Sequence, residues 1–381
     1  MGDRLAELLG GLHGAQDLVW SETGVCPRRL PAWASAQAAD PALDVMAGMP
    51  AGVRFEVLTE ATELELDVLA TFLEVDGSRV GPEAAWFDLV VGGEVVGADV
   101  VQDGTRVVVD QTTGVFDVVE GAAATVRFTL PGDPTVPVQI WLPHGTTIEL
   151  RAARLSAGAT ARPATDSNPR WVHHGSSISH CLEIERPTRT WPALVARRAG
   201  YDLRDLAFAG QCVLDPCVAR VIRDRPADLI SLKVGINVVN GDTMRERAFV
   251  PALHGFLDTI REGHPTIPLV LVTPIHCPAA ETTPGPTVEG PDGRYRTVPR
   301  PAELAEGALH LARIRELITA TVDARRSAGD PHLHLLDGVV LFGPDDVHDL
   351  SDGLHPNEAG YARIADRFLA LAGGRGGPFT T

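Results

Sequence analysis

The sequence predicts two domains: an N-terminal all-β sandwich, then a three-layer α/β domain on a five-stranded parallel sheet. Short β-prone runs separated by turn signals fill residues 50–150. Beyond residue 170, apolar strands alternate with amphipathic helical patterns, as in parallel sheets covered on both faces. Between them, residues 156–169 are small, polar and proline-containing, as expected of a linker. The 381 residues suffice for two cores, and we expect domains at 1–160 and 161–381.

The N-terminal half has the strand pattern of a small antiparallel sandwich, similar to a carbohydrate-binding module. Its ELELDV stretch alternates charged and apolar residues with period two. No helix-length amphipathic stretch interrupts the β runs, and residues 1–50 are expected to add a helix and an edge strand. Four tryptophans in this half could stack on a sugar ring, but core packing is the expected role of each. The expected strands are 54–58, 63–75, 86–91, 94–101, 105–110, 125–130 and 138–142.

The C-terminal half has five apolar runs that predict the parallel sheet. On such sheets, ligands bind at the carboxyl ends of the strands. The segment 278–301 is rich in proline and glycine and has no strand or helix pattern, so we expect a lid or pocket wall there. The expected strands are 171–175, 202–210, 228–235, 267–275 and 332–338.

Composition argues against several classes of function. The formal charge of −17 disfavours nucleic-acid binding, which needs a clustered positive surface. The sequence has no run of about 18 apolar residues, the length that a membrane span needs. The N-terminus lacks the pattern of a secretory signal. The five cysteines are few and odd in number, so we expect reduced thiols in a cytoplasmic protein. The histidines and cysteines show no metal-ligand spacing, and no metal is expected.

Polar and small residues follow the ends of the predicted strands. A serine of GSSIS, Ser176 or Ser177, could act as a nucleophile near a helix N-terminus. The base it needs could be His355, and Asp352 could orient the imidazole. The Gly210 N–H and the Asn237 amide could stabilise an oxyanion. These residue types together predict acyl-transfer chemistry.

GSSIS, FAGQ, GIN and DGLHPN resemble, in order and context, the four signature blocks of the SGNH, or GDSL, family of serine hydrolases and acyltransferases. The resemblance covers roughly residues 170 to 372. It implies that Ser177 is the nucleophile, that Asp352 and His355 complete the triad, and that Ser177, Gly210 and Asn237 form the oxyanion hole.

Two positions depart from the family pattern. Ser176 replaces the acidic residue of the family's GDS string, and Val238 follows Asn237 where the family often has aspartate. Neither position supplies the nucleophile, the base or an oxyanion donor. The departures therefore concern how the nucleophile turn is held.

The two-domain layout, with TPIHCP after the fourth strand of the α/β domain, resembles a bacterial subgroup that includes an acyltransferase of tetracycline tailoring. The resemblance implies O-acyl transfer from an acyl-CoA co-substrate to a hydroxyl of a polyketide or glycosylated natural product, without a bound cofactor. The alternative is carboxylic ester hydrolysis, on a carbohydrate ester for example. A third hypothesis is a glycan-binding protein with an inactive hydrolase domain. The acyl donor, the acceptor and the oligomeric state are not predicted.

Overall fold

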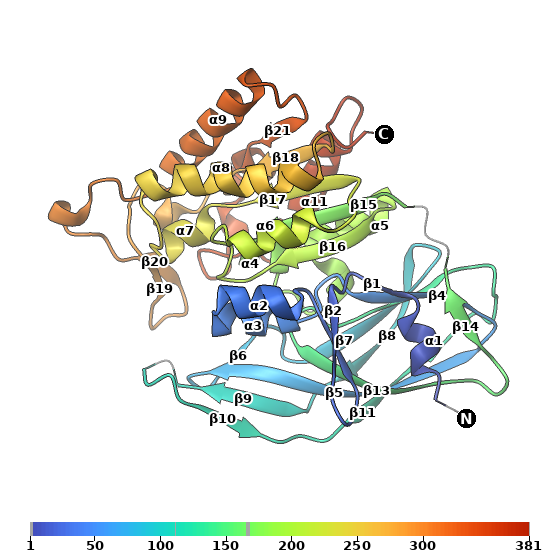
Figure 1. Ribbon diagram of the computed structural model, residues 1–381. Helices are drawn as coiled ribbons and strands as arrows, with labels where there is room; N and C mark the ends of the chain where they lie inside the picture. The colour runs from blue at the N-terminus through green and yellow to red at the C-terminus, as the bar shows by residue number, and fades with distance from the viewer. Residues whose placement is uncertain (1–2, 111, 165–167, 381) are drawn as a thin grey trace.

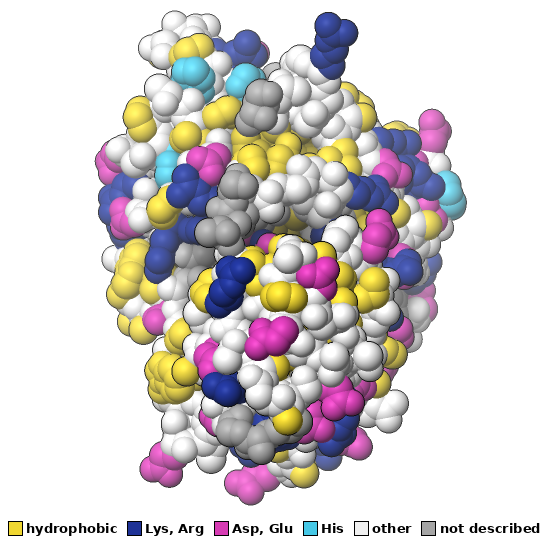
Figure 2. All heavy atoms as spheres, turned by 90° about the vertical axis from the view of Figure 1, so that its right-hand side faces the viewer, with side chains coloured by type: hydrophobic (Ala, Val, Ile, Leu, Met, Phe, Trp, Pro, Cys, Tyr) yellow, Lys and Arg dark blue, Asp and Glu magenta, His cyan; other side chains and the backbone are white. Residues whose placement is uncertain are grey.

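The computed structural model describes residues 3–110, 112–164 and 168–380, and it confirms the two-domain layout (Figure 1). A β-rich N-terminal part packs against a C-terminal α/β part. No helix in these described ranges is both long and apolar enough to cross a bilayer. Basic and acidic side chains are interspersed over the face of the molecule shown in Figure 2.

The sandwich consists of a six-stranded and an eight-stranded sheet. The first contains, in order, β1 (Leu12–His13), β4 (Arg54–Thr59), β12 (Val138–Trp141), β7 (Ala85–Val91) and β8 (Glu94–Val101), with β14 (Ala161–Pro163) beside β4. The second contains β10 (Phe116–Val119), β9 (Thr105–Val109), β5 (Glu63–Val75), β13 (Thr147–Leu155), β3 (Val25–Arg28) and β2 (Asp17–Trp20), with β11 (Ala124–Thr129) and β6 (Ser78–Val80) beside β5. Residues 161–163, which the sequence analysis assigned to the second domain, thus pair within the sandwich.

The strands expected in this half are present, but the sandwich is not purely antiparallel. β9 pairs with β5 in parallel, with Thr71 opposite Thr105. The chain leaves β8 in one sheet and enters β9 in the other, where β9 runs beside β5 in the same direction. Alternation in a sequence indicates which face of a strand is buried but not the direction of its neighbour.

The N-terminal lead-in, by which we mean the described residues up to residue 50, contains more structure than the expected helix and edge strand. Besides β1–β3 it forms α1 (Leu5–Leu9), α2 (Ala32–Ala38) and α3 (Pro41–Gly48). Apolar residues of α2, α3 and their flanks, such as Leu30, Leu43 and Met49, belong to the same buried cluster as the α/β core. The sandwich core, which includes Phe55 and Phe87, is a separate cluster. The lead-in therefore completes the core of the second domain.

The α/β domain is the expected three-layer structure. Its parallel sheet has the order β16 (Asp202–Ala207), β15 (Arg170–Gly175), β17 (Leu229–Lys233), β18 (Leu269–Val272) and β21 (Leu333–Leu336). One face carries α5 (Trp191–Ala199) and α11 (Glu358–Ala372), where Phe368 stacks on Trp171. The other carries α6 (Pro216–Arg223) and α8 (Glu246–Gly263), where Phe256 stacks on His174, and α9 (Leu311–Ser327) lies beside α8 and β21. The short elements are α4 (Ser177–His180), α7 (Ile236–Asn240), α10 (Gly338–Leu341), β19 (Thr287–Glu289) and β20 (Tyr295–Thr297).

Buried polar groups join the two domains along the edge strand β16. The Arg29 side chain is fully buried, and it donates to the carbonyl oxygens of Met49 at 2.5 Å and of Ala207. Arg54, 2% exposed, donates to Asp202 at 2.9 Å. Because these groups are removed from water, each contact holds the sandwich in one position on the sheet.

Arg29 also contacts the segment that leads to Gly210. Its guanidinium lies 4.8 Å from the centre of the Phe208 ring and donates to the Met46 carbonyl at 2.6 Å. Burial lowers the pKa of Arg29 to about 10, although the nearby Asp205 carboxylate opposes the shift. The side chain therefore remains charged at neutral pH, where carbonyl oxygens and the Asp205 carboxylate stabilise the charge.

We predict that Arg29→Ala lowers the free energy of unfolding by about 3 kcal/mol, since it leaves several buried carbonyl oxygens without donors. Chemical denaturation followed by circular dichroism measures the change. The control is Arg127→Ala, whose side chain is 65% exposed; we expect a change within about 0.5 kcal/mol there. Equal stabilities of the two variants would contradict the role given to Arg29.

Lys233, the single lysine of the chain, ends the central strand β17 in a buried position. It is 1% exposed, and its Nζ has no hydrogen-bond partner among the described residues. Burial lowers the pKa of Lys233 to about 8 from an ordinary value of 10.5. A charged amine without a hydrogen-bond acceptor destabilises the folded chain.

We predict that Lys233→Met stabilises the protein by about 2 kcal/mol at pH 7, because methionine fills a similar volume without a charge. Between pH 8 and 10.5 the unfolded chain binds more protons at Lys233 than the folded chain does, so this group makes stability rise with pH. The difference in unfolding free energy between variant and parent should shrink across that window. A constant difference would contradict the prediction.

Candidate active site

Ser177 is the first residue of α4 and is separated from the strand β15 by one residue, Ser176. Ser176 is fully buried and caps this helix, because its Oγ accepts a hydrogen bond from the Ile178 N–H at 3.3 Å. A Cβ at Gly175 would lie 2.4 Å from Ser179 Oγ, so only glycine fits there. Ser176 therefore holds the turn where the family has an acidic residue, and Ser177 is partly exposed.

The structure brings together the three residues that the sequence predicts as a triad. His355 Nε2 lies 2.9 Å from Ser177 Oγ, and His355 Nδ1 lies 2.6 Å from Asp352 Oδ2. The second Asp352 oxygen accepts the backbone N–H groups of Leu354 at 2.8 Å and His355 at 2.7 Å. Asp352 thus orients the imidazole of His355, and His355 Nε2 can take the proton of Ser177 Oγ, as general-base activation of a serine requires.

The charges around His355 favour its protonated form. Burial by itself lowers the pKa of the imidazole, but the attraction of Glu183 and Asp352 outweighs this, and the net shift is upward. For Asp352, burial raises the pKa, but the hydrogen bond and charge of His355, together with the backbone N–H groups of His355 and Leu354, outweigh burial and the net shift is downward. The aspartate therefore stays ionised and can stabilise an imidazolium.

The base is held in place by the start of the last helix. Asn357 caps α11, since its side chain accepts the Gly360 N–H at 3.0 Å, and its Nδ2 donates to Asp349 at 3.1 Å. His355 lies two residues before this cap and is 8% exposed. The DGLHPN string thus places the acid, the base and the helix cap in one turn.

The predicted oxyanion donors lie at the ends of neighbouring strands. Gly210 follows β16 and has a φ of 72°, which favours glycine, although a Cβ there would meet no atom within 4 Å. Asn237 is 5% exposed, and its Oδ1 accepts the Cys212 N–H at 3.0 Å. This bond directs Nδ2 away from Cys212. Three donors make no hydrogen bond to any group within the described ranges: the N–H of Ser177, the N–H of Gly210 and the Asn237 Nδ2.

The segment 278–301 lies against the triad, but it is not structureless as predicted. Its strands β19 and β20 form a short antiparallel hairpin. The Tyr295 N–H donates to the Asp352 carbonyl at 2.8 Å, and the Tyr295 ring meets the His355 ring edge-on, with centroids 5.4 Å apart. The hairpin thus covers one side of the base.

Glu183 is a member of the site that sequence reasoning missed. Its Oε1 lies 3.3 Å from His355 Nδ1, and its Oε2 accepts the hydroxyl of Tyr361 at 2.8 Å. Glu183, Asp352 and His355 have ligand atoms close enough to hold a metal ion. A metal on Nδ1 would replace the hydrogen bond to Asp352 and pull electron density from the imidazole, so the geometry fits a base better than a metal site.

The structure also shows the surroundings of a histidine that precedes the nucleophile turn and of the four tryptophans in the N-terminal half. His173 is buried, with its ring nitrogens 2.7 Å from Ser231 Oγ and 2.9 Å from Ser179 Oγ. Of the sandwich tryptophans, Trp141 is 2% exposed, but Trp20 and Trp33 are 64% and 45% exposed, so the expectation of core packing is wrong for these two. Trp86 lies beneath the Arg186 guanidinium, 5.0 Å from it.

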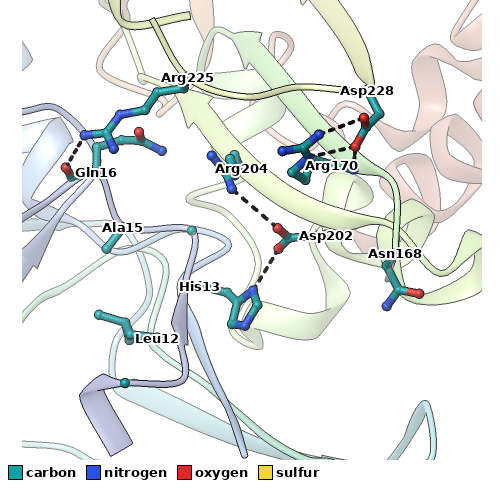
Figure 3. Close-up of a pocket in the computed structure, with 12 residues that line it drawn as sticks. Leu12, His13, Ala15, Gln16, Asn168, Arg170, Asp202, Arg204, Arg225 and Asp228 are labelled. Atoms are coloured by element: carbon teal, nitrogen blue, oxygen red, sulfur yellow. Dashed lines mark hydrogen bonds and ion pairs between the residues drawn. The ribbon is translucent and has the colours of Figure 1, made fainter. Parts of the chain in front are cut away.

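A cavity of about 600 Å³ lies between the domains at the opposite end of β15 and β16 (Figure 3). It is lined by the first residues of these strands, Arg170 and Asp202, whereas Ser177 lies two residues beyond Gly175, the last residue of β15. Asp202 contacts His13 at 3.2 Å, and Arg170 pairs with Asp228 at 2.8 Å. The cavity is therefore separate from the triad.

Comparison with known proteins places the chain in a family. The model of the GDSL-like lipase/acylhydrolase family matches residues 174–363. Among solved structures, a salicylyl-acyltransferase, SsfX3, from a tetracycline biosynthetic pathway is 30% identical, with a TM-score of 0.75 over 93% of this chain and 92% of that one. No curated protein matches.

Two further structures share the fold at lower identity. A GDSL-like lipase of Bacteroides ovatus is 18% identical, with a TM-score of 0.64 over 96% of each chain. A family two carbohydrate esterase of Clostridium thermocellum is 13% identical, with a TM-score of 0.54 over 94% of this chain and 97% of that one. The matched region contains Ser177, Gly210, Asn237, Asp352 and His355. The chain belongs to the GDSL-like lipase/acylhydrolase family.

Proposed function

We propose that the protein is a serine O-acyltransferase that moves an acyl or aryl group from a coenzyme A thioester to a hydroxyl of a polyketide or glycosylated natural product. The observation that carries catalysis through an acyl-enzyme is the continuous contact from Ser177 through His355 to Asp352. Likeness to the salicylyl-acyltransferase over both domains supports transfer. Acyl-CoA would act as a substrate, in the cytoplasm, and no bound cofactor would be needed.

The proposed reaction has two steps. His355 Nε2 takes the proton of Ser177 as its Oγ attacks the thioester carbonyl, and the N–H groups of Ser177 and Gly210 with Asn237 Nδ2 stabilise the oxyanion. The C–S bond then breaks and the thiol leaves with the proton from His355. In the second step the acceptor hydroxyl gives its proton to His355 and attacks the acyl-enzyme. Ser177 leaves and regains the proton, and the product ester is released.

Carboxylic ester hydrolysis is the second candidate, because water can take the place of the acceptor hydroxyl at the same triad. Ser177 is partly exposed, so water can reach its acyl-enzyme unless the substrate covers it. The two outcomes differ in what resolves the acyl-enzyme and not in the residues that form it.

We predict that Ser177→Ala lowers kcat for 4-nitrophenyl acetate by at least about 1,000-fold, because the nucleophile is lost. The matched control is Ser176→Ala, which removes the neighbouring hydroxyl. We expect it to keep turnover within about tenfold and to lose about 1 kcal/mol of stability with the helix cap. Unchanged turnover in Ser177→Ala would refute the nucleophile assignment.

We predict that salicylyl-CoA acylates Ser177 and that hydroxyl-bearing polyketides accelerate release of the acyl group. Intact-mass spectrometry would detect the adduct on the wild-type protein and not on Ser177→Ala. Thioester consumption should rise with acceptor concentration, with one ester formed per thiol released. Thioester loss that never depends on an acceptor would favour the hydrolase.

A further inference from the structure

Two carboxylates, and not one, face His355 Nδ1. Asp352 Oδ2 lies at 2.6 Å and Glu183 Oε1 at 3.3 Å. The shorter distance is that of a charge-assisted hydrogen bond, and the longer one is beyond that range but well within reach of electrostatic attraction. Asp352 therefore accepts the Nδ1 hydrogen bond, while Glu183 lies beside it as a second negative group.

The position of Glu183 is set by the nucleophile helix. α4 begins at Ser177 and ends at His180, and the next residue, Cys181, has a φ of 59° and turns the chain back. The Ile184 N–H donates to the Cys181 carbonyl at 3.0 Å and closes this turn. Glu183 thus lies on the segment that directly follows the nucleophile helix, and its side chain is 24% exposed.

Tyr361 holds the other Glu183 oxygen. This tyrosine of α11 is fully buried, and its hydroxyl donates to Glu183 Oε2 at 2.8 Å. Burial, with the nearby Glu183 charge, raises the pKa of Tyr361 well above its usual range, so the phenol stays a donor. Because the buried Tyr361 hydroxyl binds Oε2, the other oxygen, Oε1, is directed toward His355.

We propose that Glu183 is a positioning residue that shares the stabilisation of the His355 imidazolium with Asp352 and accepts the Nδ1 hydrogen bond when Asp352 cannot. This inference rests on the proposed function, since it assigns a role in the same triad. Proton transfer remains between Ser177 Oγ and His355 Nε2, and neither carboxylate gains a proton. To accept the hydrogen bond, Glu183 would approach Nδ1 by about 0.5 Å, to the length of a charge-assisted bond.

The remaining groups near His355 stay uncharged or point elsewhere. Tyr295 lies against the imidazole, and burial raises the pKa of its phenol to about 12. Cys277 Sγ contacts the Gly353 carbonyl at 3.5 Å, and burial raises the pKa of this thiol. Arg294 donates to the backbone carbonyl of Ser351 at 3.4 Å. Glu183 and Asp352 are therefore the charges whose removal should change the titration of His355.

The test is a double-mutant cycle of Glu183→Gln and Asp352→Asn, assayed with 4-nitrophenyl acetate across pH. Catalysis needs a neutral imidazole, and Glu183 raises the pKa of His355. The acid limb of kcat/KM should therefore move to lower pH in Glu183→Gln. At the plateau we expect a loss of about fivefold in the wild type and at least about fiftyfold in the Asp352→Asn background, because the second carboxylate is then also lost.

The matched control is Glu185→Gln, which removes one negative charge from an exposed position of the same loop. Its acid limb should stay within experimental error of the wild type, whereas Glu183→Asp should recover part of the shift. Tyr361→Phe, which frees Glu183, should move the acid limb in the same direction as Glu183→Gln. Thermal unfolding of each variant separates misfolding from loss of the charge.

An acid limb that stays in place in both Glu183→Gln and Tyr361→Phe would overturn the proposal, as would an equal loss from Glu183→Gln in both backgrounds. Failure of the proposed function has a different signature, because Ser177→Ala would then leave ester turnover unchanged. If Ser177→Ala abolishes turnover and the acid limb does not move in Glu183→Gln and Tyr361→Phe, the triad assignment is confirmed and the proposed role of Glu183 is wrong.

Discussion

The buried guanidinium of Arg29 is the contact on which the arrangement of the two domains depends. It joins carbonyls from the lead-in, at Met46 and Met49, to carbonyls of the edge strand β16, at Asp205 and Ala207. A charge out of water is tolerable only when its donors are satisfied, so these segments must stay together. β16 leads to Gly210, and the lead-in thereby fixes one side of the proposed oxyanion hole.

The domains are consequently less independent than the linker in the sequence suggests. Residues around Leu30 and Met49 are part of the α/β core, and the fully buried Asp88 of the sandwich accepts hydrogen bonds from Arg186 at 2.6 Å and Thr188 at 2.5 Å. These last two residues lie between the nucleophile helix α4 and α5. Both the nucleophile side and the oxyanion side of the site therefore contact the first half of the chain.

Local patterns explain what the sequence could predict. Strands such as 63–75 were recognisable because burial on one face imposes period two, and DGLHPN contains the acid, the base and the helix cap within one turn. The parallel pairing of β5 with β9 and the packing of the lead-in depend on contacts between distant segments. Glu183 belongs to this second class, since it reaches the site through Tyr361, 178 residues away.

The hairpin of β19 and β20 contacts both the acid and the base of the triad. Tyr295 fixes the Asp352 carbonyl through its backbone N–H while its ring covers the His355 imidazole. The same segment that shields the base from water on one side therefore also positions the acid. For the proposed acyl transfer, exclusion of water favours transfer over hydrolysis, and a displaced hairpin would lose both the cover of His355 and the hydrogen bond to the Asp352 carbonyl. In the proposed reaction, the exclusion of water from the base and the placement of the acid therefore depend on the same hairpin.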